Sequence, residues 1–268
     1  MPNFFRDWRR RRILEKHPIP DELWENGLEL VPALDDLSDE EILKLRDLVT
    51  VFLHDKVFES AGGFEIDDRV RSVIASLCCL LILELDLDSY SGLKSIIVYP
   101  GEFKTRHEHG IAHVDERSQS GESAPDDGIA LSWADVVASV QEPYDGYNVV
   151  LHECAHKIDM LGGGDANGTP PLHADMGDSE WRRVFTRSFE HFSWEIDHGG
   201  ETQLDDYGAE SPSEFFAVTT EAFFECPDIL VEEYPEVYEQ LRLLYRQDPL
   251  SRMPPPEVED DVRPEDVN

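Results

Sequence analysis

The sequence predicts an α+β fold in which a small sheet packs on helices, with an additional N-terminal layer of helices. Two observations predict this class. Several segments repeat apolar residues at helical spacing and begin with capping residues, whereas only short runs, most clearly residues 95–99, have the β-branched composition of a strand. With 268 residues, 40% of them apolar, the chain is long enough to bury a substantial core.

We expect three parts along the chain. Residues 1–20 form a basic N-terminal arm, which is either solvated or a helix packed on the acidic body. Residues 21–250 form a single domain, with a helical layer at 21–90 and the core that carries the chemistry at 91–250. Residues 251–268 are expected to be a disordered acidic tail, because they mix proline with acidic residues.

Three helices are predicted in the N-terminal layer. The first covers residues 21–31. A capping box at residues 38–41 opens the second, which the glycine pair at 62 and 63 is expected to end. The third covers residues 67–85, where the sequence is apolar enough for burial nearly all round.

Strands are predicted in the middle of the chain. The strand at residues 95–99 ends at Pro100, and shorter candidates lie at 111–114 and 129–133. Three histidines between them could suggest a second metal site, but their spacing fits no ligand pattern, so we interpret them as surface residues: His107, His109 and His113.

Three further helices are predicted in the C-terminal part. Asp178 is expected to cap a helix of about residues 180–195. Another begins at residues 211–214, with Pro212 in its first position, and the last covers residues 235–246.

Residues 147–161 carry the motif H-E-x-x-H. Because a helix has 3.6 residues per turn, His152 and His156 lie one turn apart on one face and can bind one metal ion. Glu153 lies about 100° around the helix from His152, so it can reach a water molecule at the metal without being a ligand. We favour a metal site over a pair of surface histidines because the opposite face is apolar: Val150, Cys154, Ile158 and Leu161.

A catalytic zinc site needs a third protein ligand and leaves a fourth position for water. The metzincin arrangement is excluded, because this chain has Asp159 and Gly162 where that class has glycine and histidine. Glu214 and Glu221, seven residues apart on one face of a later helix, are the candidates. Glu214 could instead complete a capping box with Ser211. Whichever glutamate is not a ligand could hold a histidine in place from behind.

The formal net charge is −35, from 58 acidic and 23 basic residues. This charge excludes nucleic acids and anionic membranes as partners of the body of the protein. The acidic residues spread from Asp21 to Asp266, as on a hydrated surface in a salt-rich cytoplasm, where screening suppresses repulsion. We therefore expect a halophilic protein whose folding depends on molar salt.

We expect a cytoplasmic protein. The four cysteines, at 78, 79, 154 and 226, contain no C-x-x-C pair and are predicted to be reduced apolar fillers, with Cys154 facing the core. The arginines near the start are followed by no signal-peptide apolar region, and the best apolar run, residues 76–83, is too short to span a bilayer.

Several motifs at matching intervals resemble one family. The chain is similar to the Mlc titration factor A family of bacterial zinc metallopeptidases, over nearly everything before the tail. The motifs that carry the resemblance are residues 58–65, Val98-Tyr99-Pro100, Leu131-Ser132-Trp133, residues 152–159, Gly164-Asp165-Ala166-Asn167-Gly168, Tyr207, residues 212–218 and residues 245–250.

The resemblance implies a zincin-like metallopeptidase core of the gluzincin type, related to the peptidase domain of anthrax lethal factor. It implies that His152, His156 and Glu214 bind one zinc ion, that Glu153 is the catalytic base and that Tyr207 is the active-site tyrosine. A peptide or protein is the implied substrate. The implied alternative is a regulatory protein that sequesters a transcriptional repressor of sugar uptake, like Mlc, with peptidase activity secondary.

Two further expectations concern the surroundings of the motif. Asp159, one turn beyond His156, either binds that histidine or caps the helix end. The strand at residues 129–133, if it forms the edge of the cleft, could hold an extended peptide by main-chain hydrogen bonds.

Overall fold

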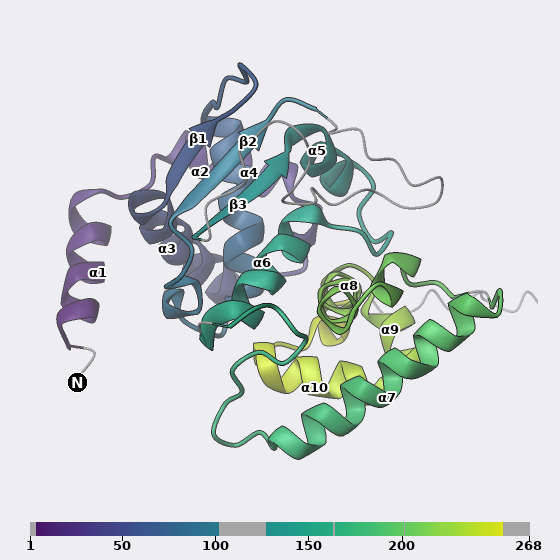
Figure 1. Ribbon diagram of the computed structural model, residues 1–268. Helices are drawn as coiled ribbons and strands as arrows, with labels where there is room; N and C mark the ends of the chain where they lie inside the picture. The colour runs from purple at the N-terminus through teal and green to yellow at the C-terminus, as the bar shows by residue number, and fades with distance from the viewer. Residues whose placement is uncertain (1–3, 102–126, 163, 201, 254–268) are drawn as a thin grey trace, which may run out of the picture.

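The structure, a computed structural model, describes residues 4–101, 127–162, 164–200 and 202–253 (Figure 1). In chain order the helices and strands are α1 (Phe4–Lys16), α2 (Asp21–Leu30), α3 (Asp39–Asp55), β1 (Val57–Ser60), α4 (Asp68–Leu81), β2 (Ser95–Tyr99), β3 (Gly128–Ser132), α5 (Trp133–Gln141), α6 (Val149–Asp159), α7 (Asp178–Asp197), α8 (Pro212–Glu225), α9 (Pro227–Glu233) and α10 (Pro235–Tyr245). This mixture of helices with a small sheet confirms the α+β class.

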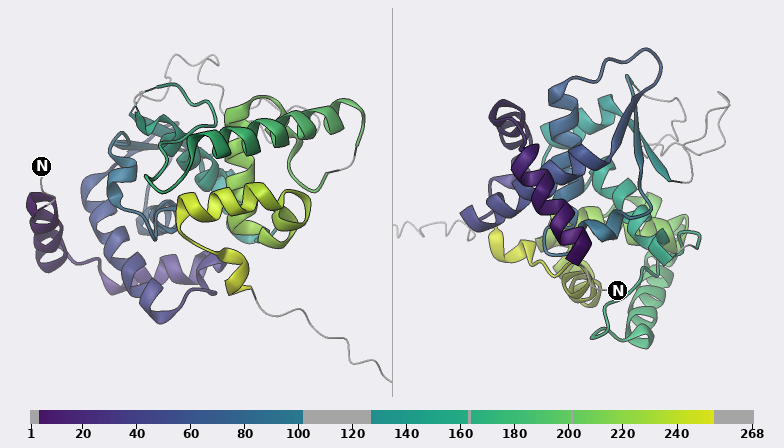
Figure 2. Two further views of the ribbon diagram at one scale, coloured as in Figure 1. Left: turned by 90° about the horizontal axis from the view of Figure 1, so that it is seen from below. Right: turned by 90° about the vertical axis from the view of Figure 1, so that its left-hand side faces the viewer.

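The sheet and α2 to α5 lie on one side of the molecule and α7 to α10 on the other, with α6 between them (Figures 1 and 2). Helix α6 contacts α4 and β3 on one side and α8 on the other. The helix that carries the H-E-x-x-H motif therefore joins the two halves of the fold.

The three strands are parallel and lie in the order β1-β2-β3. Ile96 of the central strand pairs with Phe58 on one side and Ile129 on the other. Parallel strands need a crossover connection, which α4 supplies between β1 and β2. Because strands of a parallel sheet are covered on both faces, β2 is a continuous apolar run without alternation. The predicted strands at 95–99 and 129–133 are confirmed, except that Trp133 already belongs to α5.

The prediction that one helix runs from the capping box to the glycine pair was wrong. Ser38 and Glu41 do form the capping box, but α3 ends at Asp55 and strand β1 follows. Phe58 is the buried residue of this strand. One buried side chain gives too little alternation to indicate a strand, and β1 forms through main-chain pairing with β2.

Smaller differences lie in the later helices. Asp178 does not cap α7 but is its first residue, and the capping residue is Gly177, which makes no side-chain cap hydrogen bond. The short helices α5 and α9 were not predicted. The expected strand at 111–114, the three histidines between residues 107 and 113, and residues 254–268 of the expected tail lie outside the described residues. The first residues of that tail were wrongly predicted to be disordered, because Ser251 and Arg252 belong to the 3-10 helix Pro249–Arg252.

Helix α1 packs on the acidic body at the edge of the molecule (Figure 2). Ile13 is its buried residue. The Arg9 guanidinium donates two hydrogen bonds to Asp55, at 2.7 and 2.5 Å, and Arg10 donates to Asp86 and Asp88 at 2.8 and 3.1 Å. Of the two alternatives for the basic arm, the structure thus shows the packed helix.

Helix α4 is buried on nearly all sides, as predicted, although it ends at Leu81. Its contact with α2 is close, because a Cβ on Gly27 would lie 2.5 Å from Ser72 Oγ and 2.7 Å from Ser76 Oγ. No helix in the described part of the chain is long and apolar enough to cross a membrane.

We expect Gly27→Val to lower the free energy of unfolding by about 1–3 kcal/mol, because its side chain must displace the buried hydroxyls of Ser72 and Ser76 or move α2 away from α4. Gly92→Val is the control, since no atom lies within 4 Å of the Cβ position there. Urea unfolding of both variants measures the difference. Equal midpoints for the two variants would contradict the close packing.

Candidate metal centre

Helix α6 begins at a capping residue and buries one face. The side chain of Asn148 accepts a hydrogen bond from the backbone N–H of Leu151 at 3.2 Å. Val150, Cys154 and Ile158 of the predicted apolar face are at most 3% exposed. All four cysteines are free and buried, and the Sγ of Cys154 lies 3.2 Å from that of Cys78. Burial of this face directs the two histidines toward α8.

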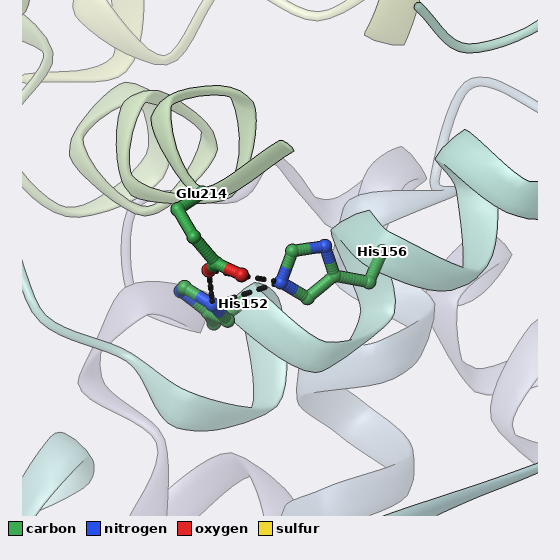
Figure 3. Close-up of side chains that lie close together, drawn as sticks. All are labelled: His152, His156 and Glu214. Atoms are coloured by element: carbon green, nitrogen blue, oxygen red, sulfur yellow. Dashed lines mark hydrogen bonds and ion pairs between the residues drawn. The ribbon is translucent and has the colours of Figure 1, made fainter. Parts of the chain in front are cut away.

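His152, His156 and Glu214 bring three donor atoms together from α6 and α8 (Figure 3). The distances are 3.0 Å from His152 Nε2 to Glu214 Oε2, 3.2 Å from His156 Nε2 to the same oxygen, and 3.1 Å between the two Nε2 atoms. Zinc bonds of about 2.0–2.1 Å place tetrahedral ligands roughly 3.3 Å apart. The three atoms therefore fit one face of a zinc coordination tetrahedron.

Of the two roles that the sequence left open for Glu214, the structure shows the carboxylate at the histidines, and no hydrogen bond between this carboxylate and the Ser211 backbone completes a capping box in the described part of the chain. The Glu214 backbone N–H donates to the Ser211 side chain at 3.2 Å, so the residue belongs to the cap of α8. Its carboxylate lies against the two histidines. Helix capping by Ser211 thus fixes the backbone of Glu214 while its side chain remains at the candidate metal centre.

Glu221 lies behind His152, on the side away from Glu214. Its carboxylate binds His152 Nδ1 at 2.7 Å and accepts the backbone N–H of Asn148 at 2.6 Å. A carboxylate at Nδ1 fixes the ring orientation and keeps Nε2 available to a metal. By contrast, His156 Nδ1 has no hydrogen-bond partner in the described part of the chain.

The site favours positive charge where the two histidine Nε2 atoms and the Glu214 carboxylate lie together. Burial lowers the pKa of His152, but the charge of Glu221 and hydrogen bonds to Glu214 and Glu221 outweigh it and raise this pKa to about 10. The pKa of Glu214 is well below its usual value, because hydrogen bonds from both histidines outweigh its burial. A bound divalent cation satisfies the same electrostatic demand as a proton.

The remaining predicted residues lie around this cluster. Glu153 is half-buried on α6, next to His152. Tyr207 lies in the 3-10 helix Asp206–Ala209, with its ring centroid 6.1 Å from that of His152. The Asp159 carboxylate accepts backbone N–H groups of the loop at residues 167–169. Asp159 thus does not cap the end of α6. It also does not bind His156, because the buried Nδ1 of His156 has no hydrogen-bond partner among the described residues.

Asn148 and Glu225 support the site and were missed in the sequence. Asn148 Nδ2 donates to Glu225 at 2.8 Å, and the backbone N–H of Tyr144 donates to the same carboxylate at 3.0 Å. An asparagine directly before an apolar helical run is an N-cap signal that could have indicated the first residue. No local signal marks Glu225, because its partners are 77 and 81 residues away.

Burial raises the pKa of the Glu225 carboxyl from 4.5 to about 7. Between pH 4.5 and about 7 the Glu225 carboxyl is therefore protonated in the folded protein but ionised in the unfolded chain. The contribution of this group to the free energy of unfolding is fully present below pH 4.5 and is lost as the pH rises through about 7. Glutamine is uncharged throughout, so the stability of Glu225→Gln relative to the unmodified protein should rise over this range, by at most about 1.4 kcal/mol per pH unit. Urea unfolding at several pH values measures this difference. A difference independent of pH would contradict the assignment.

The mixed fold and the converging donors define an α+β protein with a candidate metal site. The sequence profile described as "Glucose-regulated metallo-peptidase M90" matches residues 5–246, and the chain therefore belongs to this family of metallopeptidases. It is 35% identical to Mlc titration factor A of Cronobacter sakazakii over 92% of both chains. It is 35% identical to the Escherichia fergusonii protein of that name, over 86% of this chain and 88% of the relative. An uncharacterized protein of Synechocystis is 33% identical over 91% of this chain and 90% of its own length.

Proposed function

We propose that this chain is a cytoplasmic, zinc-dependent peptidase of the gluzincin type, with His152, His156 and Glu214 as metal ligands. The observation that carries the proposal is the convergence of these three donor atoms within 3.2 Å of one another. Two imidazoles and one carboxylate are a known donor set of catalytic zinc, which keeps a fourth position open. Membership of a metallopeptidase family supports the same chemistry.

A zinc ion held by His152, His156 and Glu214 would polarise a carbonyl group and lower the pKa of a water molecule to about 7. Glu153 accepts the proton of the attacking water and later transfers it to the leaving amine. The Tyr207 hydroxyl stabilises the negative charge that develops on the carbonyl oxygen, a contribution of about 10²–10³ in rate for one such donor. Glu221 keeps the His152 ring in the orientation that presents Nε2.

Strand β3 supplies a surface for an extended peptide. It contacts α6, and in the described part of the chain it pairs only with β2. We expect its outer main-chain groups to form hydrogen bonds with the backbone of a substrate that lies along α6, the helix that carries both histidines. This mode of binding depends little on substrate side chains and is consistent with a peptide or protein substrate.

Metal analysis and a panel of chromogenic peptides test the proposal. We expect stoichiometric zinc in the purified protein, cleavage of at least some peptides, loss of cleavage on chelation and its return on adding zinc. Protein that binds no zinc under these conditions would overturn the proposed function.

A second candidate function follows from the name of the relatives. Proteins 33–35% identical to this chain are called Mlc titration factor A. A regulatory protein that sequesters a transcriptional repressor would need the surface of the fold but not the proton transfer by Glu153. A variant that no longer cleaves peptides but still binds such a repressor would favour this function.

A further inference from the structure

A buried carboxylate at the end of α6 organises the loop that follows. Asp159 is 5% exposed. Its Oδ2 accepts the backbone N–H groups of Asn167 and Gly168 at 2.6 and 2.7 Å, and its Oδ1 accepts that of Thr169 at 2.9 Å. Three N–H groups on one carboxylate fix the loop backbone relative to the helix that carries His156.

The same loop lies directly against the first turn of α8. Gly168 has a φ of +74°, and a Cβ there would lie 2.4 Å from the carbonyl oxygen of Pro212 and 2.9 Å from its carbonyl carbon. The carbonyl oxygen of Gly168 accepts a hydrogen bond from Trp181 Nε1 at 2.9 Å, which holds the loop from the other side. Only glycine permits both this φ and this approach. Pro212 is the first residue of α8, two residues before Glu214.

The two helices are therefore tied together on both sides of the metal ligands. At the start of α6, Asn148 binds Glu221 and Glu225 in the second half of α8. At the end of α6, Asp159 holds the loop that rests on Pro212. We call this second connection, formed by Asp159, residues 167–169 and Pro212, the Asp159 clip. The ligands from α6 and α8 lie between the two connections.

We propose that the Asp159 clip is a positioning device that sets the distance between the Glu214 carboxylate and the two histidines, and thereby the metal affinity. This inference rests on the proposed function, because it requires that all three side chains bind the metal. A displacement of the first turn of α8 moves Glu214 directly, whereas His152 and His156 stay on the packed helix α6. Asp159 and Gly168 are not among the three converging donors. They act through the loop backbone, Asp159 by accepting its N–H groups and Gly168 by its close approach to Pro212.

The zinc affinity of Gly168→Ala, measured by competition with a chromogenic chelator, tests the clip. We expect a loss of about 10–100-fold, the range found when residues that orient metal ligands are replaced. Asp159→Asn, which weakens the hold on the loop without adding bulk, should lower the affinity in the same direction. It also keeps the test valid if Gly168→Ala does not fold. Gly199→Ala is the matched control, since its φ is +71° but no atom lies within 4 Å of the Cβ position.

The visible absorption of the Co²⁺-loaded protein separates positioning from general destabilisation. We expect the Gly168→Ala spectrum to move away from that of the unmodified protein, toward that of Glu214→Gln, while Gly199→Ala leaves it unchanged. A reduced affinity with an unchanged spectrum, or unchanged affinity in both clip variants, would overturn the clip and leave the metal site intact. Absence of zinc binding in the unmodified protein would instead overturn the proposed function, and the clip with it.

Discussion

Glu153→Gln should reduce kcat for peptide cleavage by about 10²–10⁴, because glutamine cannot accept the proton of the attacking water. The side chain keeps its size, and Glu153 is not among the three converging donors, so zinc content should stay that of the unmodified protein. Cleavage of a chromogenic peptide at saturating concentration, with metal content measured on the same sample, checks both expectations.

Glu190→Gln is a suitable control for this variant. Glu190 is an exposed glutamate on α7, a helix that supplies none of the three converging donors, so its replacement makes the same chemical change outside the donor set. If Glu153→Gln retained the activity of this control, Glu153 would not be the general base. Loss of zinc from Glu153→Gln would show that the residue holds the metal.

Glu214→Gln should weaken zinc binding by more than about a hundredfold, and Glu221→Gln by only about 10–100-fold. The first change removes a carboxylate that lies against both Nε2 atoms. The second change alters a carboxylate that binds Nδ1 of His152, and replacing a residue that orients a ligand typically lowers metal affinity by about 10–100-fold. Competition with a chromogenic chelator gives both dissociation constants.

This pair of variants decides between the two glutamates that the sequence left as candidates. The spacing of seven residues put both on one face of the helix. In the structure the Glu214 carboxylate lies at Nε2 of His152 and the Glu221 carboxylate at Nδ1 of the same ring. A larger loss of zinc affinity in Glu221→Gln than in Glu214→Gln would reverse their roles.

The parts of the molecule that could be predicted from sequence are those with a local signal. The H-E-x-x-H helix has apolar residues at helical spacing, β2 is a continuous apolar run, and α3 opens with a capping box. Strand β1 could not be found this way, since Phe58 is its one buried residue and its stability comes from pairing with residues nearly 40 positions later. The partners of Asp159 and Glu225 were hidden for the same reason, because tertiary contacts rather than local patterns bring them together.

The donor set is divided between two distant stretches of sequence, since Glu214 follows His156 by 58 residues. During synthesis both histidines are added to the chain before the third donor. A nascent chain that ends before α8 therefore offers a metal two imidazoles alone. In the proposed function, tight binding of the ion and cleavage of peptides therefore require that α8 has been synthesised and has folded against α6.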